Sequence, residues 1–407
     1  MPADPASAEA RLLGAALGLE DCPATSYDDD LALWAASGAM HLTGRPDGPP
    51  MAPAAPVASR LTGAAAVLAA LGGPAVDGPS LLAMRAASRG LTRGGRVSAG
   101  GASRLLPTRD GWLAVTLSRD VDVELVPAWL EDEDDGWDAV AEAARTRSAA
   151  ELAGRGQELG LAVAVVPTTS AEGPSLPWRV TGTGGPVPDR LRVLDLSALW
   201  AGPLCAHLLR RSGADVTTVD STGRPDGAQV GDARLYALLH EGHRRQPVDL
   251  RTAEGRAELR RLVDAADVVV TSVRRRALER LGFGPLDEVR RRPGLTWVAV
   301  TAYGLDSDGV GFGDDTAAAG GLVAWDGEGP VFCADAAADP ATGLYAAVAA
   351  LGCVRSGGGL VDVALRDVAR HLARPPLRPE PPRVTGGDPW VVHTPAGVVP
   401  VALPVAP

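Results

Sequence analysis

An internal repeat constrains the fold of this 407-residue chain more than any other feature of its sequence. Residues 56–72 read PVASRLTGAAAVLAALG, residues 336–352 read AAADPATGLYAAVAALG, and eight of these seventeen positions are identical. Self-similarity of this kind indicates a duplicated structural unit. The copies differ where the first has Ser59 and the second has Asp339. We therefore expect one working carboxylate site beside a site that has lost its carboxylate.

The similarity extends to both sides of the repeat. Matching pairs of segments are 26–50 with 311–330, 80–89 with 361–370, and 109–117 with 395–403. The first copy continues to about residue 166, whereas residues 190–310 show no counterpart before residue 26. The chain is thus predicted to join the back half of one unit to the front half of another. The predicted divisions are a large-domain fragment of the first copy (1–76), its smaller domain and return segment (77–166), a linker (167–190), the large domain of the second copy (191–373) and a truncated smaller-domain remnant (374–407). The remnant begins with a second predicted linker, 374–388, which like the first is rich in Gly and Pro.

Strands and helices alternate through the second large domain. Apolar, β-branched runs predict strands over 191–199, 214–220, 267–273 and 295–303, and amphipathic patterns predict helices over 201–213 and 252–266. The predicted fold class is α/β, a Rossmann-like doubly wound parallel sheet with a smaller α+β domain, and its binding crevice lies at the carboxyl ends of the strands. The turn LWAGP lacks G-x-G-x-x-G, which favours an adenine nucleotide other than NAD.

Composition excludes several classes of function. The formal net charge of −11 argues against nucleic-acid or membrane-surface binding. The chain has no lysine, which rules out a Schiff-base or P-loop lysine. No histidine has a Ser or Cys partner at a triad spacing, and no cluster indicates a metal. The scattered cysteines and the absence of a signal sequence predict a reducing cytoplasm; they are Cys22, Cys205, Cys333 and Cys353.

Asp339 is the candidate nucleophile. It precedes Pro340 and a helical run, so the pattern predicts a helix that begins with Asp339 as N-cap. Ser59 fits the same capping role, and capping alone therefore explains both residues. A carboxylate at a helix N-terminus is expected to stay ionised because the helix dipole disfavours its protonation. An ionised and positioned carboxylate can attack an acyl carbon.

Arginines and glycines supply the candidate binding elements. Arg244 and Arg274 are placed by the pattern in loops near strand ends, where they are candidates for phosphate contact. The other arginine clusters are interpreted as solvated faces. Gly100 and Gly101 precede the predicted strand GWLAVTL, and a glycine loop of this kind can cover a neighbouring site.

Three blocks of sequence resemble the family III CoA-transferases, which include formyl-CoA transferase, carnitine CoA-transferase and α-methylacyl-CoA racemase. They are VLDLSALWAGPLCAHLLRRSGADVTTVD (193–220), HRRQPVDLRTAEGRAELRRLVDAADVVVTSVRRRALERLGF (243–283), and ADPATGLYAAVAAL with GGGLVDVALRDV (338–351 and 357–368). The resemblance implies that Asp339 is the catalytic carboxylate. It implies a coenzyme A site at Trp200, Ala201, Gly202, Pro203, Arg244, Ser272 and Arg274, with Gly100 and Gly101 closing over Asp339.

The resemblance also implies the reaction and the assembly. CoA passes from an acyl-CoA donor to a carboxylic acid through aspartyl anhydride and thioester intermediates, with the CoA thioester as substrate and no tightly bound cofactor. Family members form interlocked dimers, so this chain is expected to be either a homodimer or a pseudo-dimeric monomer.

Departures from the family pattern keep two alternatives open. Ser272, His243, Thr218 and Asp220 stand where the family has Asn, Lys, Lys and Glu, so one alternative is a non-catalytic CoA-binding or interaction homologue. The other is an acyl-CoA racemase or isomerase. That branch uses a Gly-His-Asp segment, which here reads Gly313-Asp314-Asp315, and the missing His favours acyl transfer.

Overall fold

The computed structural model describes residues 4–21, 29–168, 176–182, 184–223, 225–375, 381–387 and 389–405. Cys22 and the beginning of the 26–50 repeat segment lie outside the described residues, as do parts of the two predicted linkers. None of the described helices is long and apolar enough to cross a lipid bilayer.

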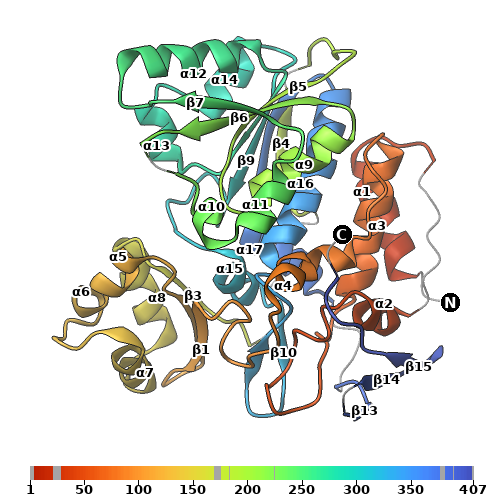
Figure 1. Ribbon diagram of the computed structural model, residues 1–407, viewed down its shortest axis with the longest axis vertical. Helices are drawn as coiled ribbons and strands as arrows, with labels where there is room; N and C mark the ends of the chain where they lie inside the picture. The colour runs from red at the N-terminus through yellow and green to blue at the C-terminus, as the bar shows by residue number, and fades with distance from the viewer. Residues whose placement is uncertain are drawn as a thin grey trace.

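A seven-stranded sheet forms the centre of the large domain, in the order β4-β12-β9-β8-β5-β6-β7 (Figure 1). Its strands are β4 (Trp178–Gly182), β5 (Arg192–Leu196), β6 (Asp215–Ser221), β7 (Arg244–Val248), β8 (Val268–Thr271), β9 (Thr296–Thr301) and β12 (Gly359–Ala364). All neighbours are parallel except β4, which runs antiparallel to β12. The parallel strands follow the 3-2-1-4-5-6 order of a Rossmann sheet, which confirms the predicted fold class.

Helices cover both faces of this sheet. Val268 and Val270 of β8 belong to the main core, whereas Val269 between them packs into a second core with Leu259 and Val289. This alternation follows from the two-residue period of a strand. On the main-core face lie α9 (Ala201–Arg211) and α16 (Ala338–Arg355), and the other core is formed with α12 (Ala253–Ala265), α13 (Arg275–Arg280) and α14 (Pro285–Arg291). The remaining helices of this part are α10 (Gly227–Gly231), α11 (Ala233–Leu239), α15 (Gly313–Ala319) and α17 (Leu365–Leu372).

The predicted linkers are wrong in part because each contains a strand. β4 lies within 167–190 and pairs with β12, where Val180 faces Val361. Only Trp178 of β4 is buried, so the strand has no alternating pattern that the sequence could reveal. The second linker contains β13 (Val384–Gly386), which forms a small antiparallel sheet with β14 (Trp390–Thr394) and β15 (Gly397–Pro400).

The first segment of the chain shares the core of the second. Its helices are α1 (Pro5–Ala16), α2 (Asp30–Ala36), α3 (Val57–Ala70) and α4 (Met84–Arg89), with the short 3₁₀ helix η1 (Pro79–Ala83) before α4. Leu61 and Leu68 of α3 belong to the same buried cluster as Leu344 and Tyr345 of α16. The core is therefore continuous between the two halves of the chain.

Helix packing repeats in the two halves. A Cβ atom on Gly63 of α3 would lie 2.5 Å from the carbonyl oxygen of Ala6 in α1, and one on Gly343 of α16 would lie 2.9 Å from that of Ala201 in α9. Each glycine therefore permits close contact with a neighbouring helix. α3 thus packs closely on α1, and α16 packs closely on α9.

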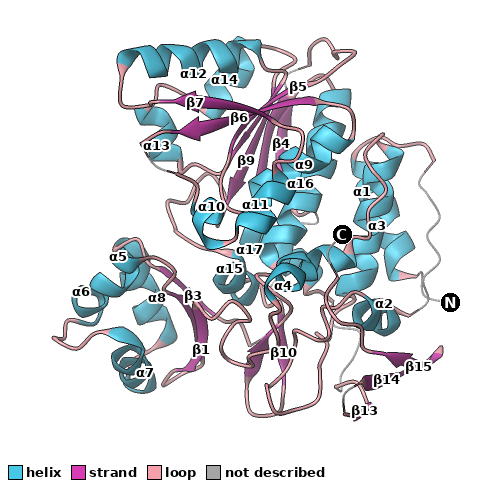
Figure 2. Ribbon diagram, in the orientation of Figure 1, coloured by secondary structure: helices cyan, strands magenta, loops and turns pink. Residues whose placement is uncertain are grey.

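A smaller domain lies to one side of the large sheet, at the lower left of Figure 2. It contains the antiparallel sheet β1 (Ser103–Pro107), β2 (Trp112–Thr116) and β3 (Ala162–Val165), with helices α5 (Asp120–Glu124), α6 (Val126–Leu130), α7 (Gly136–Thr146) and α8 (Ala149–Glu158). Leu113, Trp129 and Val163 lie in its own buried cluster. The hairpin of β10 (Val323–Trp325) and β11 (Pro330–Phe332) completes the described strands.

Candidate active site

Asp339 is the second residue of α16 and is half-buried. The helix begins at Ala338, after Ala337 as N-cap, and no side chain caps it. The predicted N-cap role of Asp339 is therefore wrong. Its side chain instead reaches the start of α15, because a Cβ on Gly313 would lie 2.5 Å from Asp339 Oδ2. The absence of a side chain at Gly313 makes room for this carboxylate.

Burial is the main influence on the proton affinity of Asp339, and it raises the pKa of the carboxyl to about 7. The neighbouring Asp314 and Asp335 raise this pKa further, whereas Arg85 and the backbone N–H of Gly313 oppose the shift. The expectation that the helix dipole keeps the group fully ionised is wrong, since desolvation is the larger effect. Near neutral pH the site holds both the acid and the carboxylate.

Arg85 of α4 joins the elements around this carboxylate. Its Nε donates to Asp335 Oδ2 over 2.8 Å and its Nη2 donates to Asp335 Oδ1 over 2.5 Å. Its guanidinium carbon lies 5.1 Å from the ring centroid of Trp200. Arg85 was not among the residues predicted from the sequence, although it lies within the repeated segment 80–89, opposite Arg366 of the segment 361–370.

Gly100 and Gly101 form a turn that approaches the same place. The N–H of Gly101 donates to the carbonyl of Ser98 over 2.8 Å, and Gly101 has a left-handed φ of 81°. A methyl group on Gly100 would come within 2.9 Å of Arg85 Nη2 and 4.0 Å of Asp335 Oδ1. The loop of the first segment thus lies against groups that surround Asp339.

Buried hydroxyl and carboxyl groups connect the smaller domain to α15. The hydroxyl of Ser103 in β1 donates to Asp314 over 2.9 Å, and that of Thr116 in β2 donates to Asp315 over 3.0 Å. Asp314 also accepts from the N–H of Ala336 over 3.1 Å. Burial raises the pKa of Asp315 to about 8, so this group carries its proton at neutral pH.

The predicted A-G-P turn is found where α9 begins. Trp200, Ala201, Gly202 and Pro203 are all buried, and the indole Nε1 of Trp200 has no hydrogen-bond partner. A Cβ on Gly202 would lie 2.3 Å from that of Ser197, so glycine is needed for this strand-to-helix turn. These side chains shape the turn from inside and do not face solvent.

Ser272 links two strand ends at the point where the strand order reverses. Its hydroxyl accepts a hydrogen bond from the N–H of Ala198 over 2.9 Å, which joins the carboxyl ends of β5 and β8. Ligands of doubly wound sheets bind at this reversal. Arg274 lies two residues further on, exposed just before α13, and its side chain has no hydrogen bond or ion pair with another described residue.

Arg244 is not brought to this place, which corrects its predicted position. It is the exposed first residue of β7 and pairs with Thr217 of β6. The strand pairing places Arg244 level with Leu194 of β5 and Val269 of β8, within the sheet and not in a loop at the strand ends. Ser272 and Arg274 lie further along, beyond the carboxyl end of β8.

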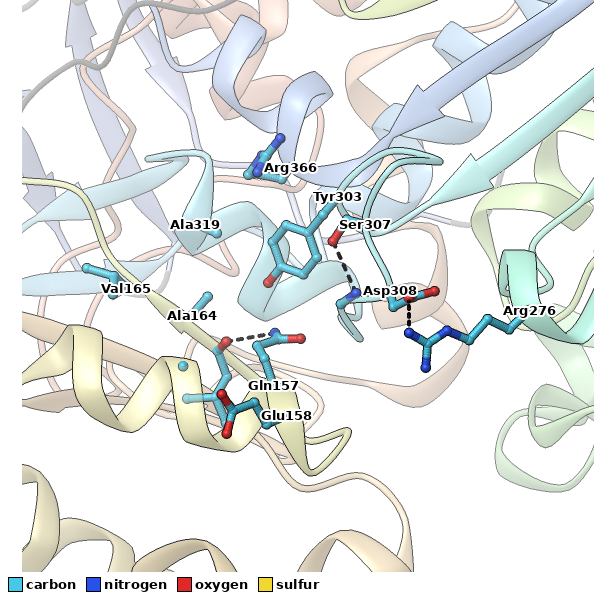
Figure 3. Close-up of a pocket in the computed structure, with 13 residues that line it drawn as sticks. Gln157, Glu158, Ala164, Val165, Arg276, Tyr303, Ser307, Asp308, Ala319 and Arg366 are labelled. Carbon is cyan, nitrogen blue, oxygen red and sulfur yellow. Dashed lines mark hydrogen bonds and ion pairs between the residues drawn. The ribbon is translucent and has the colours of Figure 1, made fainter. Parts of the chain in front are cut away.

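A cavity of about 610 Å³ opens between the smaller domain and the large sheet (Figure 3). Tyr303 projects into it, with its hydroxyl toward Gln157 and its ring beneath Arg366. Asp339 is not among the residues that line this cavity; they are Gly154, Gln157, Glu158, Val163, Ala164, Val165, Arg276, Tyr303, Ser307, Asp308, Gly309, Ala319 and Arg366. Gly313 and Ala319, at opposite ends of α15, adjoin Asp339 and the cavity respectively.

Ser59 marks the matching position of the first copy. It is completely buried, its backbone N–H donates to Asp30 Oδ1 over 2.8 Å, and its hydroxyl has no hydrogen-bond partner. It lies in the first turn of α3, which no side chain caps, so the predicted capping role is wrong here also. Among the described residues no group of His, Cys, Asp and Glu has the arrangement of a metal site.

The molecule is therefore an α/β protein with a Rossmann-like sheet and a carboxylate cluster where α15, α16 and the first segment meet. Residues 189–381 match the family model of CoA-transferase family III. The resemblance inferred from the sequence is confirmed.

Individual relatives match a similar portion of the chain. Succinyl-CoA–D-citramalate CoA-transferase of Chloroflexus aurantiacus is 32% identical over 44% of this chain and 48% of its own length. Succinate–glutarate CoA-transferase of Agrobacterium fabrum is 30% identical over 46% and 56%. The crystal structure of a hypothetical protein from Mycobacterium tuberculosis is 29% identical, with a TM-score of 0.44 over 53% of this chain and 65% of that protein. The chain thus spans about half the length of the curated relatives it matches.

Proposed function

We propose that this protein transfers coenzyme A from an acyl-CoA to a carboxylic acid, with Asp339 as the nucleophile. The observation that carries the proposal is the position of Asp339, which lies in the family-matched segment, remains half-buried, and is surrounded by Arg85 and the N–H of Gly313. With a pKa of about 7, the carboxyl supplies enough carboxylate for attack at neutral pH.

The proposed reaction passes through three covalent intermediates. Asp339 attacks the thioester carbonyl, the C–S bond breaks, and an aspartyl–acyl anhydride and a CoA thiolate form. The thiolate attacks the aspartyl carbonyl, which releases the donor acid and leaves an enzyme thioester. The acceptor carboxylate then attacks the aspartyl carbonyl of the enzyme thioester and displaces the CoA thiolate, which forms a second anhydride. The thiolate attacks the acceptor acyl carbonyl of this anhydride, the bond to the Asp339 oxygen breaks, and the acceptor acyl-CoA forms. Asp339 is regenerated, and one thioester has replaced another, so the exchange needs no ATP.

The surrounding residues support this chemistry. The N–H of Gly313 points at the carboxyl of Asp339 and is placed to stabilise the oxyanion that forms when the thiolate or the acceptor carboxylate adds to the aspartyl carbon. A single donor of this type typically contributes about 3–4 kcal/mol to a transition state. The turn at Gly100 and Gly101 would exclude water, which hydrolyses anhydrides. CoA is assigned to the crevice at Ser272 and Arg274, beside the buried turn of Trp200.

The same arrangement supports a single-chain site. Gly100 and Arg85 come from the first segment and Asp339 from the second, and they meet within one polypeptide. We therefore propose the pseudo-dimeric monomer in place of the interlocked homodimer. A mass of one chain in solution, measured together with full activity, is the expected result.

Mass spectrometry of the trapped enzyme tests the function. Two relatives are named for succinyl or succinate transfer, so succinyl-CoA is the first donor probe and other short acyl-CoAs follow. The wild type is expected to gain the mass of a CoA thioester on the peptide that contains Asp339. Asp339→Ala should gain none, whereas Asp306→Ala, whose side chain is 93% exposed, should match the wild type. Equal CoA exchange in wild type and Asp339→Ala would remove the assignment.

A CoA-binding homologue without catalysis is the second candidate. The observation that favours it is the position of Arg244, which lies within β7 and not in the predicted loop near the strand ends. Such a protein would bind CoA in calorimetry and form no adduct. A racemase, in contrast, would exchange deuterium at the acyl α-carbon, and the buried Asp314 stands where that branch has its histidine.

A further inference from the structure

We propose that Arg85 is a positioning residue that favours the carboxylate form of Asp339, so that the first segment of the chain controls the nucleophile of the second. This inference rests on the proposed function and adds a residue that acts through Asp339.

Three contacts fix the guanidinium of Arg85. Two parallel hydrogen bonds join it to Asp335, its plane lies over Trp200, and the turn at Gly100 closes one side. A paired, bidentate geometry of this kind holds an arginine in one orientation. The Nη1 atom has no hydrogen-bond partner among the described residues, and the side chain keeps 23% exposure. The group is therefore held in place with one donor left open.

The carboxyl groups that face Asp339 outnumber the cations that face it. The groups that face it are Asp314 from α15, Asp335 from the turn before α16, and Arg85 from α4. Arg85 is the only cation of this set, while Asp314 and Asp335 are both buried. Its charge is also the largest of the influences that lower the pKa of Asp339. Without Arg85, three carboxyl groups would share a desolvated volume, and their mutual repulsion would keep Asp339 protonated.

A purely structural role for Arg85 predicts a different result. The Arg85–Asp335 pair ties α4 to the start of α16, so its loss should lower stability in either case. A structural role would leave the titration of Asp339 unchanged in protein that still folds. The midpoint of that titration is therefore the measurement that separates the two roles.

Carbon NMR of protein labelled at the aspartate carboxyl carbons measures this midpoint, and Asp339→Asn identifies the resonance. The wild type is expected to titrate near pH 7. Arg85→Gln should raise the midpoint by at least one pH unit, Arg85→Lys should retain most of the wild-type value, and Arg89→Gln, an exposed position on the same helix, should leave it unchanged. If Arg85→Gln fails to fold, the double variant Arg85→Gln/Asp335→Asn removes the unpaired carboxylate and should still titrate above the wild type. An unchanged midpoint in the folded variants would overturn the proposal.

Adduct formation with succinyl-CoA gives the second readout. A rise of one pH unit in the midpoint reduces the carboxylate fraction about tenfold well below the midpoint, so the adduct rate of Arg85→Gln at pH 6 should fall about tenfold and recover as pH rises. A uniform loss at every pH would contradict the positioning role. If the wild type forms no adduct with any acyl-CoA, the transferase proposal fails, and the NMR midpoints still decide whether Arg85 controls Asp339.

Discussion

The backbone N–H of Ser59 donates a hydrogen bond to Oδ1 of Asp30 over 2.8 Å. Asp30 is the first residue of α2, the helix that precedes α3. Gly313 is the first residue of α15, the helix that precedes α16. At the second junction the acid is on the other helix, since Asp339 of α16 accepts from the N–H of Gly313. At the first junction the carboxylate belongs to the earlier helix, and at the second it belongs to the later helix. The first junction is a sealed packing contact, and the second leaves an acid half-exposed.

Restoring an acid at Ser59 should therefore not create a second site. Ser59→Asp places a carboxylate at a completely buried position beside Asp30, and two adjacent buried acids repel each other. We expect the free energy of unfolding to fall by about 3 kcal/mol or more, which urea denaturation measures. The yield of covalent adduct should remain at most one per chain.

Ser59→Ala is the matched control. The hydroxyl of Ser59 has no hydrogen-bond partner, so its removal should leave stability unchanged or slightly increased. An adduct yield approaching two per chain in Ser59→Asp would show that the first copy can be reactivated.

Gly313→Ala tests the close approach of α15 to the nucleophile. The added Cβ would lie 2.5 Å from Asp339 Oδ2 and 2.5 Å from the carbonyl oxygen of Ala336, and that backbone atom has no freedom to move away. We expect a loss of about 1–3 kcal/mol in stability from overpacking. The adduct rate should fall at least a hundredfold, because misplacement of a reacting group by about 1 Å has that effect.

Gly154→Ala provides a comparison within α8. No atom lies within 4 Å of the position its Cβ would take, and alanine favours a helix over glycine by about 0.5–1 kcal/mol. This variant should be slightly more stable than the wild type and equally reactive. A wild-type adduct rate in Gly313→Ala would show that α15 has no part in placing Asp339.

Four strands of the large sheet, β5, β6, β8 and β9, could be predicted from their apolar, β-branched runs. Val268, Val269 and Val270 are buried on both faces, so the run is apolar without interruption. β4 gave no such signal, since four of its five residues are exposed. Its position as an antiparallel edge strand depends on β12, which lies far along the chain.

Of the charged side chains in the carboxylate cluster, only Asp339 was singled out from the sequence. Asp339 stands out because the repeat supplies Ser59 as a contrast. Arg85 has no comparable contrast in a chain whose basic residues are all arginine, and its partner Asp335 is 250 positions away. The raised pKa of Asp339 likewise comes from neighbours that only tertiary structure assembles. The capping pattern in the sequence had predicted the opposite, a carboxyl group that stays ionised.

Gly100→Ala tests the loop from the first segment. Its Cβ would press on Nη2 of Arg85, which Asp335 and Trp200 hold in place. We expect a fall of about threefold to tenfold in adduct rate with little change in stability, since roughly 1 kcal/mol corresponds to a factor of five. Stopped-flow mixing with succinyl-CoA measures it.

Gly111→Ala is the control for that loop, because nothing lies within 4 Å of its added Cβ. It should react like the wild type. Equal adduct rates for Gly100→Ala and Gly111→Ala would show that the loop has no part in the reaction at Asp339. Gly101→Ala should lose about 1 kcal/mol of stability instead, since its φ of 81° strains any residue with a side chain.

The proton on Asp315 should make stability depend on pH. Its carboxyl is completely buried, Oδ2 has no hydrogen-bond partner, and burial raises its pKa from 3.8 to about 8. Between these values the folded protein binds a proton that the unfolded chain does not. This contribution to stability is therefore complete below about pH 4 and is lost as pH rises toward 8, at about 1.4 kcal/mol per pH unit.

Asp315→Asn removes this titration and keeps the shape of the protonated acid. The amide oxygen can still accept from Thr116 and from the N–H of Phe312. Relative to the wild type, the variant should gain stability steadily from pH 5 to pH 8, as urea midpoints at each pH would show. Asp306→Asn, at a side chain that is 93% exposed, should follow the wild type throughout. If Asp315→Asn also follows the wild type, then Asp315 is ionised in the folded protein, and the hydroxyl groups of Ser103 and Thr116 stabilise two buried carboxylates instead of one.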